Sequence, residues 1–206
     1  TPGTVANHVA HILAKQGLRS RVQLAVRFAS KASTDDILTL LRRLQEVGAT
    51  DFAGALQHAT DVLVSVFVVE KVDAFLYDPQ NEMLVTLGTS DTAVGRRQHE
   101  LGLHRLHVSH GGRVAWVFQE HQPFRSGRVD EDQFELEGVR RDLGIRSTIA
   151  VPLDVPLGPR GVLLVSSTQP DYFAEPDVQL LQFVAYWIAL VAQQQSLLAG
   201  RPHDDG

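Results

Sequence analysis

The chain has 206 residues, of which 44% are hydrophobic and 21% charged, and it contains no cysteine. This is the composition of an ordinary globular protein. The lack of cysteine excludes disulfides, thiolate catalysis and sulfur-ligated metals. The longest apolar run, Val62 to Val69, is interrupted by Ser65 and falls far short of the ~20 residues that cross a bilayer, so we expect no transmembrane helix. The first residues carry no signal-peptide pattern, and we expect a cytoplasmic location.

Charge is unevenly distributed along the chain. Residues 1–34 contain five cationic side chains and no acidic one, so the total of −5 leaves −10 on the remainder. A cationic segment beside an acidic domain suits contact with an anionic polymer, because phosphates attract clustered Lys and Arg. On charge alone, a solvated basic helix face is the simpler explanation.

The first two predicted elements are helices. Thr1-Pro2 is typical of a helix start, since proline at the first helical position lacks an N–H that would have no partner there. Gly17 ends this helix, and a second one is predicted from about Arg19 to Ala29. Apolar side chains recur on one face of the first helix at Val5, Val9, Ile12 and Leu13.

The stretches Thr4–Lys15, Gly17–Arg21 and Ala25-Val26 resemble the end of a LuxR-type helix-turn-helix. This resemblance implies that the first helix lies in the major groove of DNA and that the second helps to form a dimer. It departs from the family pattern at Gln16, where leucine is usual. By this resemblance, the DNA-binding residues would be Thr4, Asn7, His8, His11, Lys15, Arg19 and Arg21.

We interpret residues 1–31 as the C-terminal portion of this motif. The preceding helices, which brace the recognition helix across the DNA backbone, are not in the sequence. Either the sequence is a fragment of a longer regulator, or the segment is a remnant whose helices pack on the rest of the chain. We therefore expect DNA binding by the full-length protein, and weak or no DNA binding by this chain alone.

Residues 32–49 are predicted to form a connector helix that Thr34-Asp35-Asp36 caps and Gly48 ends. Another helix begins at Thr50-Asp51 and buries a stripe of apolar residues, at Leu56, Ala59, Leu63 and Val66. The apolar stripes of these helices and of the last helix favour a symmetric dimer. We expect a homodimer.

From Val72 onward the apolar period changes from helical to alternating. The predicted strands Val72–Asp78 and Met83–Leu87 form a hairpin whose turn is Pro79-Gln80-Asn81. The middle of the chain is predicted as a strand over Leu101–Val108, a turn at Gly111-Gly112, a helix over Val114–Glu120 and a helix over Asp132–Leu143 that ends at Gly144. The last predicted elements are strands over Ser147–Leu153 and Gly161–Ser167 and a helix over Glu175–Leu198.

This order of elements resembles the GAF domain, a ligand-sensing relative of the PAS fold. The resemblance covers residues 50–199 and implies an α+β fold, in which helices flank a GAF/PAS-like antiparallel sheet and the partial helix-turn-helix precedes it. Residues 200–206 are expected to be a disordered tail. The stretches that carry the resemblance are Gly111–Phe118, Leu143–Leu153, Arg160–Ser167 and Phe173–Asp177 with Leu180-Leu181.

The sequence offers no recognisable catalytic equipment. The GAF relatives that reduce free methionine sulfoxide or attach a bilin usually depend on cysteine, and this chain has none. The string G-x-S-x-G of a serine nucleophile is also missing. We expect a domain that is not an enzyme and that has no covalent cofactor, while the identity of any cofactor stays unknown.

Histidine is concentrated between positions 99 and 121, at His99, His104, His107, His110 and His121. Imidazole is a common ligand of zinc, haem iron and nickel, so a haem or metal sensor is one alternative. If Leu101–Val108 is a strand, however, His104 and His107 point to opposite faces and cannot share an ion. Solvent-facing or singly bonded histidines are the simpler explanation.

A ligand pocket is predicted between the sheet and the middle segment. Its aromatic residues would supply apolar walls and its arginines an anion contact, although the aromatics also suit the core and the arginines suit pairing with Asp130, Glu131 and Asp132. The candidates are His104, His107, Trp116, Phe118, Phe124, Arg125 and Arg128. The leading hypothesis is a ligand-sensing domain of a LuxR-type transcriptional regulator that signals through helical dimer contacts. The alternatives are a structural dimerisation module without ligand and a haem or metal sensor.

Overall fold

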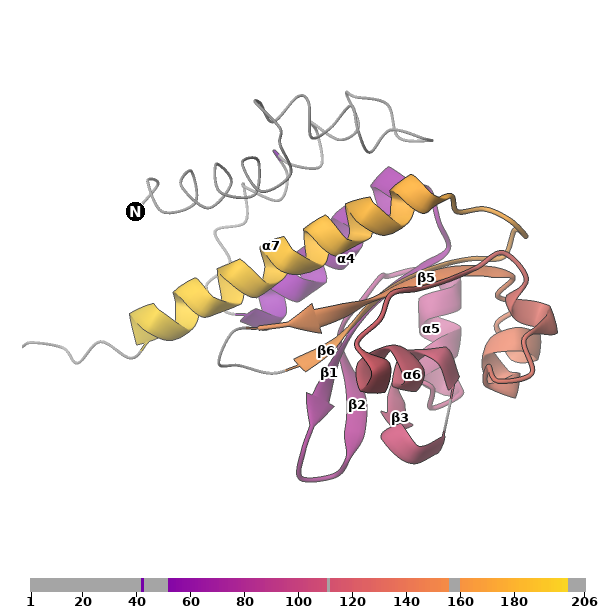
Figure 1. Ribbon diagram of the computed structural model, residues 1–206, viewed down its shortest axis with the longest axis horizontal. Coiled ribbons are helices and arrows are strands. Elements are labelled where there is room, and N and C mark those ends of the chain that lie inside the picture. Colours follow the sequence, from indigo (N-terminus) through magenta and orange to yellow (C-terminus); the bar gives the residue numbers. More distant parts are fainter. Residues whose placement is uncertain (1–41, 43–51, 111, 156–159, 200–206) are drawn as a thin grey trace, which may run out of the picture.

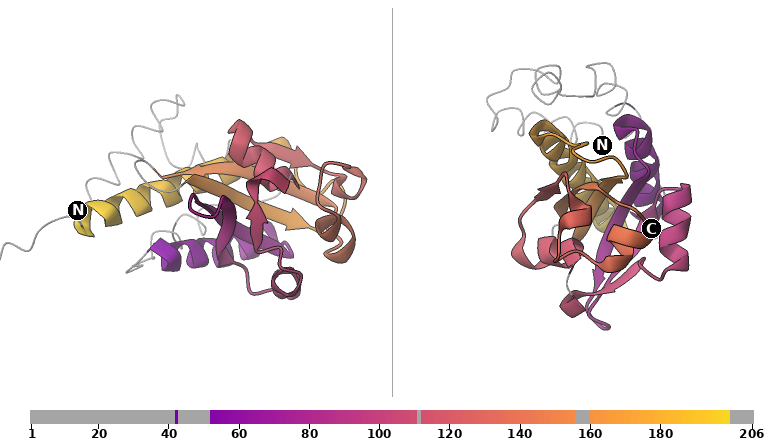
Figure 2. Two further views of the ribbon diagram at one scale, coloured as in Figure 1. Left: turned by 90° about the horizontal axis from the view of Figure 1, so that it is seen from below. Right: turned by 90° about the vertical axis from the view of Figure 1, so that its right-hand side faces the viewer.

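The computed structural model describes residues 42, 52–110, 112–155 and 160–199 (Figures 1 and 2). The predicted helix-turn-helix portion, with all seven DNA-binding candidates, lies outside the described residues, as does the predicted tail. Of the predicted connector helix only Arg42 is described, and it is helical and exposed.

A six-stranded antiparallel sheet forms the middle of the fold, with the strand order β3-β2-β1-β6-β5-β4. Its centre is the pair β1 and β6, in which Val72 lies opposite Val165 although the two strands are distant in the sequence. The strands are β1 (Lys71–Asp78), β2 (Met83–Thr89), β3 (Arg105–His107), β4 (Phe124–Ser126), β5 (Ser147–Asp154) and β6 (Arg160–Ser167).

Helices lie on both faces of the sheet. On one face, α4 (Phe52–Phe67) and α7 (Glu175–Ala199) run side by side (Figure 1). On the other face, α6 (Gly112–Glu120) packs on β5 and β6, while α5 (Ala93–Glu100) lies beside β1. Three single turns complete the described part, namely η1 (Val108–His110), η2 (Val129–Glu131) and the π-helical η3 (Gly138–Asp142). None of the described helices has both the length and the apolar character that crossing a membrane requires.

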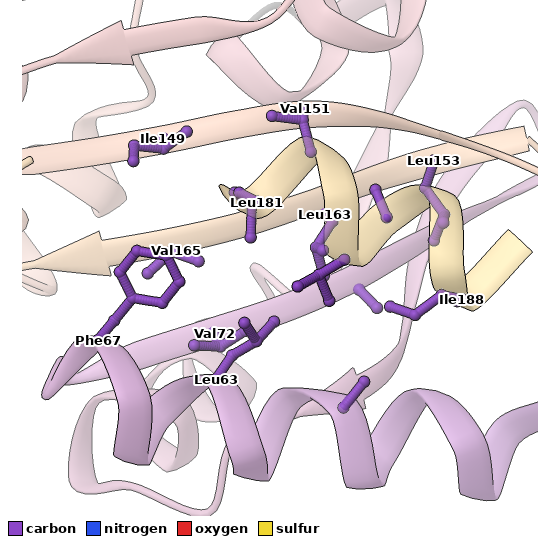
Figure 3. Packing of buried hydrophobic residues seen from close by; sticks show 14 of the residues in the cluster. Leu63, Phe67, Val72, Ile149, Val151, Leu153, Leu163, Val165, Leu181 and Ile188 are labelled. Carbon is purple, nitrogen blue, oxygen red and sulfur yellow. The ribbon is translucent and has the colours of Figure 1, made fainter. Parts of the chain in front are cut away.

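The larger apolar core lies between the sheet and the helices α4 and α7 (Figure 3). Alternate residues of β1, beginning with Val72, point to this side, and so do Leu163 and Val165 of β6. Leu63 of α4 and Leu181 of α7 meet them, each without solvent exposure. Burying such a side chain stabilises the fold by roughly 1.5–3 kcal/mol, so this layer holds α4 and α7 on the sheet.

The predicted hairpin, the last two strands, the helix before Pro123 and the two long helices over the described residues are confirmed. The hairpin turn has a local cause. The Asp78 carboxylate accepts hydrogen bonds from Gln80 N at 3.0 Å and from Asn81 Nδ2 at 2.7 Å, which is how Asp stabilises a turn. The start of α7 also has a local cause. Asp177 Oδ2 accepts a hydrogen bond from Ala174 N at 2.7 Å. This bond is one half of a capping box, and it forms here without the usual Ser or Thr at the N-cap position.

The predicted strand over Leu101–Val108 is wrong for most of its length. Only Arg105–His107 pairs with β2, and residues 101–104 form a turn after the unpredicted helix α5. Thr92 caps α5 by accepting from Gly95 N at 3.0 Å. Because α5 buries Gly95 and Gln98 rather than an apolar stripe, its periodicity did not indicate a helix.

The predicted helix over Asp132–Leu143 is wrong for its first half. Side chains compete for its backbone donors: Asp132 Oδ1 accepts from Phe134 N at 3.0 Å, and Glu135 Oε1 accepts from Leu136 N at 2.8 Å. Only Gly138–Asp142 is helical, as a π-turn. Gly144, at φ +63°, ends this segment as expected.

The joint between α4 and β1 is strained. Val68 has φ +51°, a left-handed conformation that β-branched residues rarely adopt, and its side chain is 74% exposed. The Tyr172 hydroxyl bonds to the carbonyl oxygens of Phe67 at 2.8 Å and Val68 at 3.1 Å. The segment before α7 is therefore fastened to the end of α4.

We predict that Gly161→Ala destabilises the protein by about 2–3 kcal/mol, because an added Cβ would lie 2.0 Å from the Phe75 carbonyl oxygen in the central strand pair. Gly144→Ala is the matched control: no atom lies within 4 Å of its added Cβ, so only the left-handed backbone costs energy, about 1 kcal/mol. Urea unfolding of the two variants measures the difference, and an equal loss in both would contradict the steric argument.

Candidate functional site

A small cavity of about 20 Å³ lies on the sheet face opposite α4 and α7, next to the start of α6. Most of its wall is apolar and includes Phe75, Val114 and Leu164. The rest is polar, although the surrounding protein is a buried interior. The polar residues of the wall are Lys71, Gln98, Glu135, Thr148 and Ser166, and each of them is buried.

Strand β1 supplies the charged part of this wall. Because side chains alternate along a strand, Val72 faces the helical core while Lys71 and Asp73 face the other side. Lys71 forms an ion pair with Asp73, and their side chains are 4% and 0% exposed. The sequence contained a signal for this pair, namely opposite charges two positions apart in a strand that is otherwise apolar, and our sequence reasoning missed it.

Thr148 of β5 and Ser166 of β6 lie opposite each other and form the floor of the polar wall. The Thr148 hydroxyl donates to the Val165 carbonyl oxygen at 3.0 Å. Since a hydroxyl has one hydrogen, the 3.0 Å contact between the two side-chain oxygens is then donated by Ser166. Both hydroxyl hydrogens are thus used within the protein, and the two oxygens retain only accepting capacity.

Glu135 links the cavity to the first turn of α6. Its Oε1 accepts from Leu136 N at 2.8 Å and from Arg113 N at 3.4 Å. Burial raises the pKa of Glu135, and the charges of Asp132 and Lys71 act on it in opposite directions. The irregular segment around residue 135 is therefore held to α6 by the buried carboxyl group of Glu135.

Arg113 fixes the same segment from outside. It donates two hydrogen bonds to the Asp132 carboxylate, from Nε at 2.6 Å and from Nη2 at 2.9 Å. Its guanidinium also lies over the rings of Phe124 at 4.7 Å and Phe134 at 5.3 Å. Burial acts to raise the pKa of Asp132, but the hydrogen bonds from Arg113 and the Phe134 amide outweigh it, and the pKa is lowered.

Gln98 of α5 lies over the opposite side of the cavity and is 1% exposed. Its Nε2 donates to the Leu103 carbonyl oxygen at 3.3 Å. Its Oε1 is buried and has no hydrogen-bond partner among the described residues. A buried amide oxygen without a partner costs stability, so this atom marks a position where a hydrogen-bond donor would be favoured.

The histidines do not gather at one point. His104 stacks on His99 with ring centroids 4.2 Å apart, and burial, followed by repulsion from His99 and Arg105, lowers its pKa. His107 Nδ1 contacts Ser109 Oγ at 2.8 Å, and His121 Nε2 lies 2.6 Å from Asp154 Oδ2. Within the part of the chain that the structure describes, no three His, Asp or Glu side chains are placed to hold a metal ion.

The predicted aromatic and arginine candidates lie around α6 and β4 rather than in the cavity wall. Trp116 and Phe124 pack edge to face at 6.1 Å, and Phe118 contacts Tyr77 at 4.7 Å. Arg125 donates to the Phe173 carbonyl oxygen at 3.2 Å, and Arg128 pairs with Glu131 at 2.7 Å. None of the seven ligand candidates lines the cavity. Their role in binding stays a prediction.

We predict a pH-dependent stability difference between the wild type and Glu135→Gln. A carboxyl group whose pKa is raised on folding stabilises the protein fully below its unfolded pKa, and this contribution is lost as the pH rises through the folded pKa. The variant should therefore gain stability relative to the wild type as the pH rises, which urea unfolding at a series of pH values measures. The exposed Glu137→Gln is the control, with an expected change below about 0.5 kcal/mol. A pH-independent difference for Glu135→Gln would contradict the prediction.

The fold matches several solved structures at low sequence identity. The GAF domain of an Acinetobacter phosphoenolpyruvate-protein phosphotransferase has a TM-score of 0.64 and 18% identity, covering 82% of this chain and 99% of that one. A putative GAF sensor protein from Burkholderia vietnamiensis has a TM-score of 0.65 and 17% identity, with coverages of 82% and 99%. The free methionine-R-sulfoxide reductase of Neisseria meningitidis, solved with its substrate, has a TM-score of 0.64 and 21% identity, with coverages of 83% and 97%.

Sequence comparison gives the family. A search of curated proteins returned no match. A family model described as GAF domain matches residues 49–192. The predicted α+β fold, with helices on both sides of an antiparallel sheet, is thereby confirmed. The chain belongs to the GAF domain family, whose members are sensory and regulatory domains.

Proposed function

We propose that this chain is the ligand-sensing part of a LuxR-type transcriptional regulator, and that the cavity beside Lys71, Gln98 and Glu135 is its ligand site. The observation that carries the proposal is the set of buried charged and polar groups around this cavity. Removing a charge from water costs several kcal/mol, and apolar residues of similar volume are often as stabilising as a buried ion pair. A core that served only to hold the fold together would have no need of these groups.

The connectivity supports a route for the signal. Strand β1, which carries Lys71, follows α4 directly, and β6, which carries Ser166, leads toward α7. We propose that ligand binding shifts these helices in a homodimer whose contacts they form. The proposed regulator would bind DNA in the cytoplasm through Thr4, Asn7, His8, His11, Lys15, Arg19 and Arg21, an assignment that rests on the LuxR-type resemblance.

The proposal includes no catalytic step. One of the similar structures is a reductase, but the chain contains no cysteine to act as a redox nucleophile. The polar residues of the cavity wall are a paired lysine, a buried glutamic acid, an amide and two hydroxyl groups, which suit recognition by hydrogen bonds and charge.

A structural dimerisation module is the second candidate, and the size of the cavity favours it. A volume of about 20 Å³ admits little more than one water molecule. Under this alternative the polar side chains of the wall have only a structural role, and a bound organic ligand is not expected.

Native mass spectrometry of freshly purified protein tests the two candidates. We expect a small-molecule adduct on the wild type, and its loss in the double variant Lys71→Met with Asp73→Leu, which replaces the ion pair by apolar side chains of similar size. Circular dichroism and thermal unfolding of the double variant confirm that it is folded. A wild type without adduct that also shows no thermal shift with a panel of amines, carboxylates and neutral metabolites would overturn the sensing proposal.

We also predict that this chain alone binds DNA weakly or not at all, because the residues that resemble a LuxR-type helix-turn-helix match only the last part of that motif. A gel-shift experiment at low salt, with a fragment carrying the regulator's own promoter and an unrelated fragment of equal length, measures this. Nanomolar binding that distinguishes the two fragments would contradict the prediction.

A further inference from the structure

We propose that the cavity receives a primary ammonium group, so that the ligand is a compact amine or a molecule that ends in one. This inference rests on the proposed sensing function and specifies the chemistry of its site. It follows from an inventory of the hydrogen-bond donors and acceptors in the cavity wall. Among the polar atoms of the wall, Gln98 Oε1 has no hydrogen-bond partner within the described residues, whereas each side-chain donor atom has at least one.

The acceptors come from three sides of the cavity. Gln98 contributes a buried Oε1 that has no partner within the described part of the chain. Glu135 contributes a carboxyl group of which one oxygen binds the amides of Arg113 and Leu136. The floor contributes the hydroxyl oxygens of Thr148 and Ser166, whose hydrogens are donated elsewhere.

Each side-chain donor atom of the wall has at least one partner within the protein. The Lys71 ammonium is paired with Asp73, so its charge is already balanced. The Gln98 amide nitrogen donates to Leu103, and the two hydroxyl groups donate within the floor. An anionic ligand would meet a neutralised lysine and would leave Gln98 Oε1 without a donor, whereas an ammonium group supplies a hydrogen to that atom.

Charge and size point the same way. With Glu135 ionised, the wall and the adjoining Asp73 carry one positive and two negative charges, so one cation balances the site. The small volume suits a compact head group, and the apolar side chains of Phe75, Val114 and Leu164 suit the carbon that is attached to it.

Binding should also depend on the ionisation of Glu135. The charged groups that act on this carboxyl are Asp132 in its own segment and Lys71 on β1, while the Arg113 guanidinium is bound to Asp132. Burial raises the pKa of Glu135 and so favours its protonated form. A bound cation acts in the opposite direction, because its positive charge stabilises the ionised carboxylate. Ammonium binding should therefore strengthen as the pH rises through the pKa of Glu135.

The test is a titration of the ¹⁵N-labelled full chain with methylammonium chloride, followed by NMR. Saturable shifts are expected at the Gln98 side-chain amide and at the Arg113 and Leu136 backbone amides. Sodium chloride at equal ionic strength, acetate of the same size and opposite charge, and tetramethylammonium without N–H donors are the matched controls, and we expect no saturable shift at these positions with any of them. Tighter binding of acetate than of methylammonium would overturn the proposal.

Near-isosteric variants sharpen the test. Gln98→Met removes the free acceptor and should weaken methylammonium binding roughly ten-fold, whereas Gln98→Glu adds a carboxylate and should strengthen it by a similar factor. Glu135→Gln should weaken binding and remove its pH dependence. Thermal unfolding checks that each variant is folded, and Glu137→Gln at the exposed surface should leave the affinity unchanged.

The results separate this inference from the proposed function. An anionic adduct in native mass spectrometry, or weaker methylammonium binding in Gln98→Glu, would refute the ammonium site and leave the sensing function standing. A wild type that binds neither a co-purified molecule nor any probe would refute both. Methylammonium affinity that no cavity variant changes would place binding elsewhere and also refute the ammonium site.

Discussion

Apart from their ends, the two central strands β1 and β6 are buried on both faces, and the rest of the fold depends on this constraint. Helices α4 and α7 cover one side, and α6 with the irregular middle segment covers the other. On the first side the alternating residues are mostly apolar. On the second side every polar side chain has to find its partner inside the protein, because no solvent is available there. The chemistry of the cavity is the outcome of that requirement.

The polar wall is held by elements that are irregular in themselves. The segment from Asp132 to Leu136 has no regular secondary structure, yet it is fixed at two points, by the Arg113 pair at its outer end and by the Glu135 carboxyl at its inner end. A segment fixed by a few polar contacts opens at a lower free energy than a strand in a sheet. Because these few contacts close the cavity, local opening of the segment would let in a group that is larger than the observed cavity.

The apolar framework could be predicted from the sequence, since strands β1, β5 and β6 and helices α4 and α7 each carry a periodic pattern that burial requires. The second side of the sheet could not. Helix α5 buries a glycine and a glutamine and therefore lacks an apolar stripe, and the helix expected after Asp132 lost its backbone donors to Asp132 and Glu135. The cavity residues could not be predicted from the sequence for a related reason. Thr148, Ser166 and Glu135 meet only through strand pairing and the course of a loop, and single-sequence patterns do not report either. The Lys71–Asp73 pair has a sequence signal, because two opposite charges alternate with apolar residues in β1.

The bonds from the Tyr172 hydroxyl to the end of α4 give the two long helices a common pivot. The C-terminal end of α4 and the N-terminal end of α7 lie together in Figure 1. In the sequence, the strained residue Val68 lies between α4 and Lys71. Helix α7 has 25 residues and is therefore roughly 37 Å long. Over that length, a rotation of α7 by about 5° about its N-terminal end moves its C-terminal end by about 3 Å. A displacement too small to disturb the packing around the cavity is thus large enough to change which residues meet at the other end of the helix.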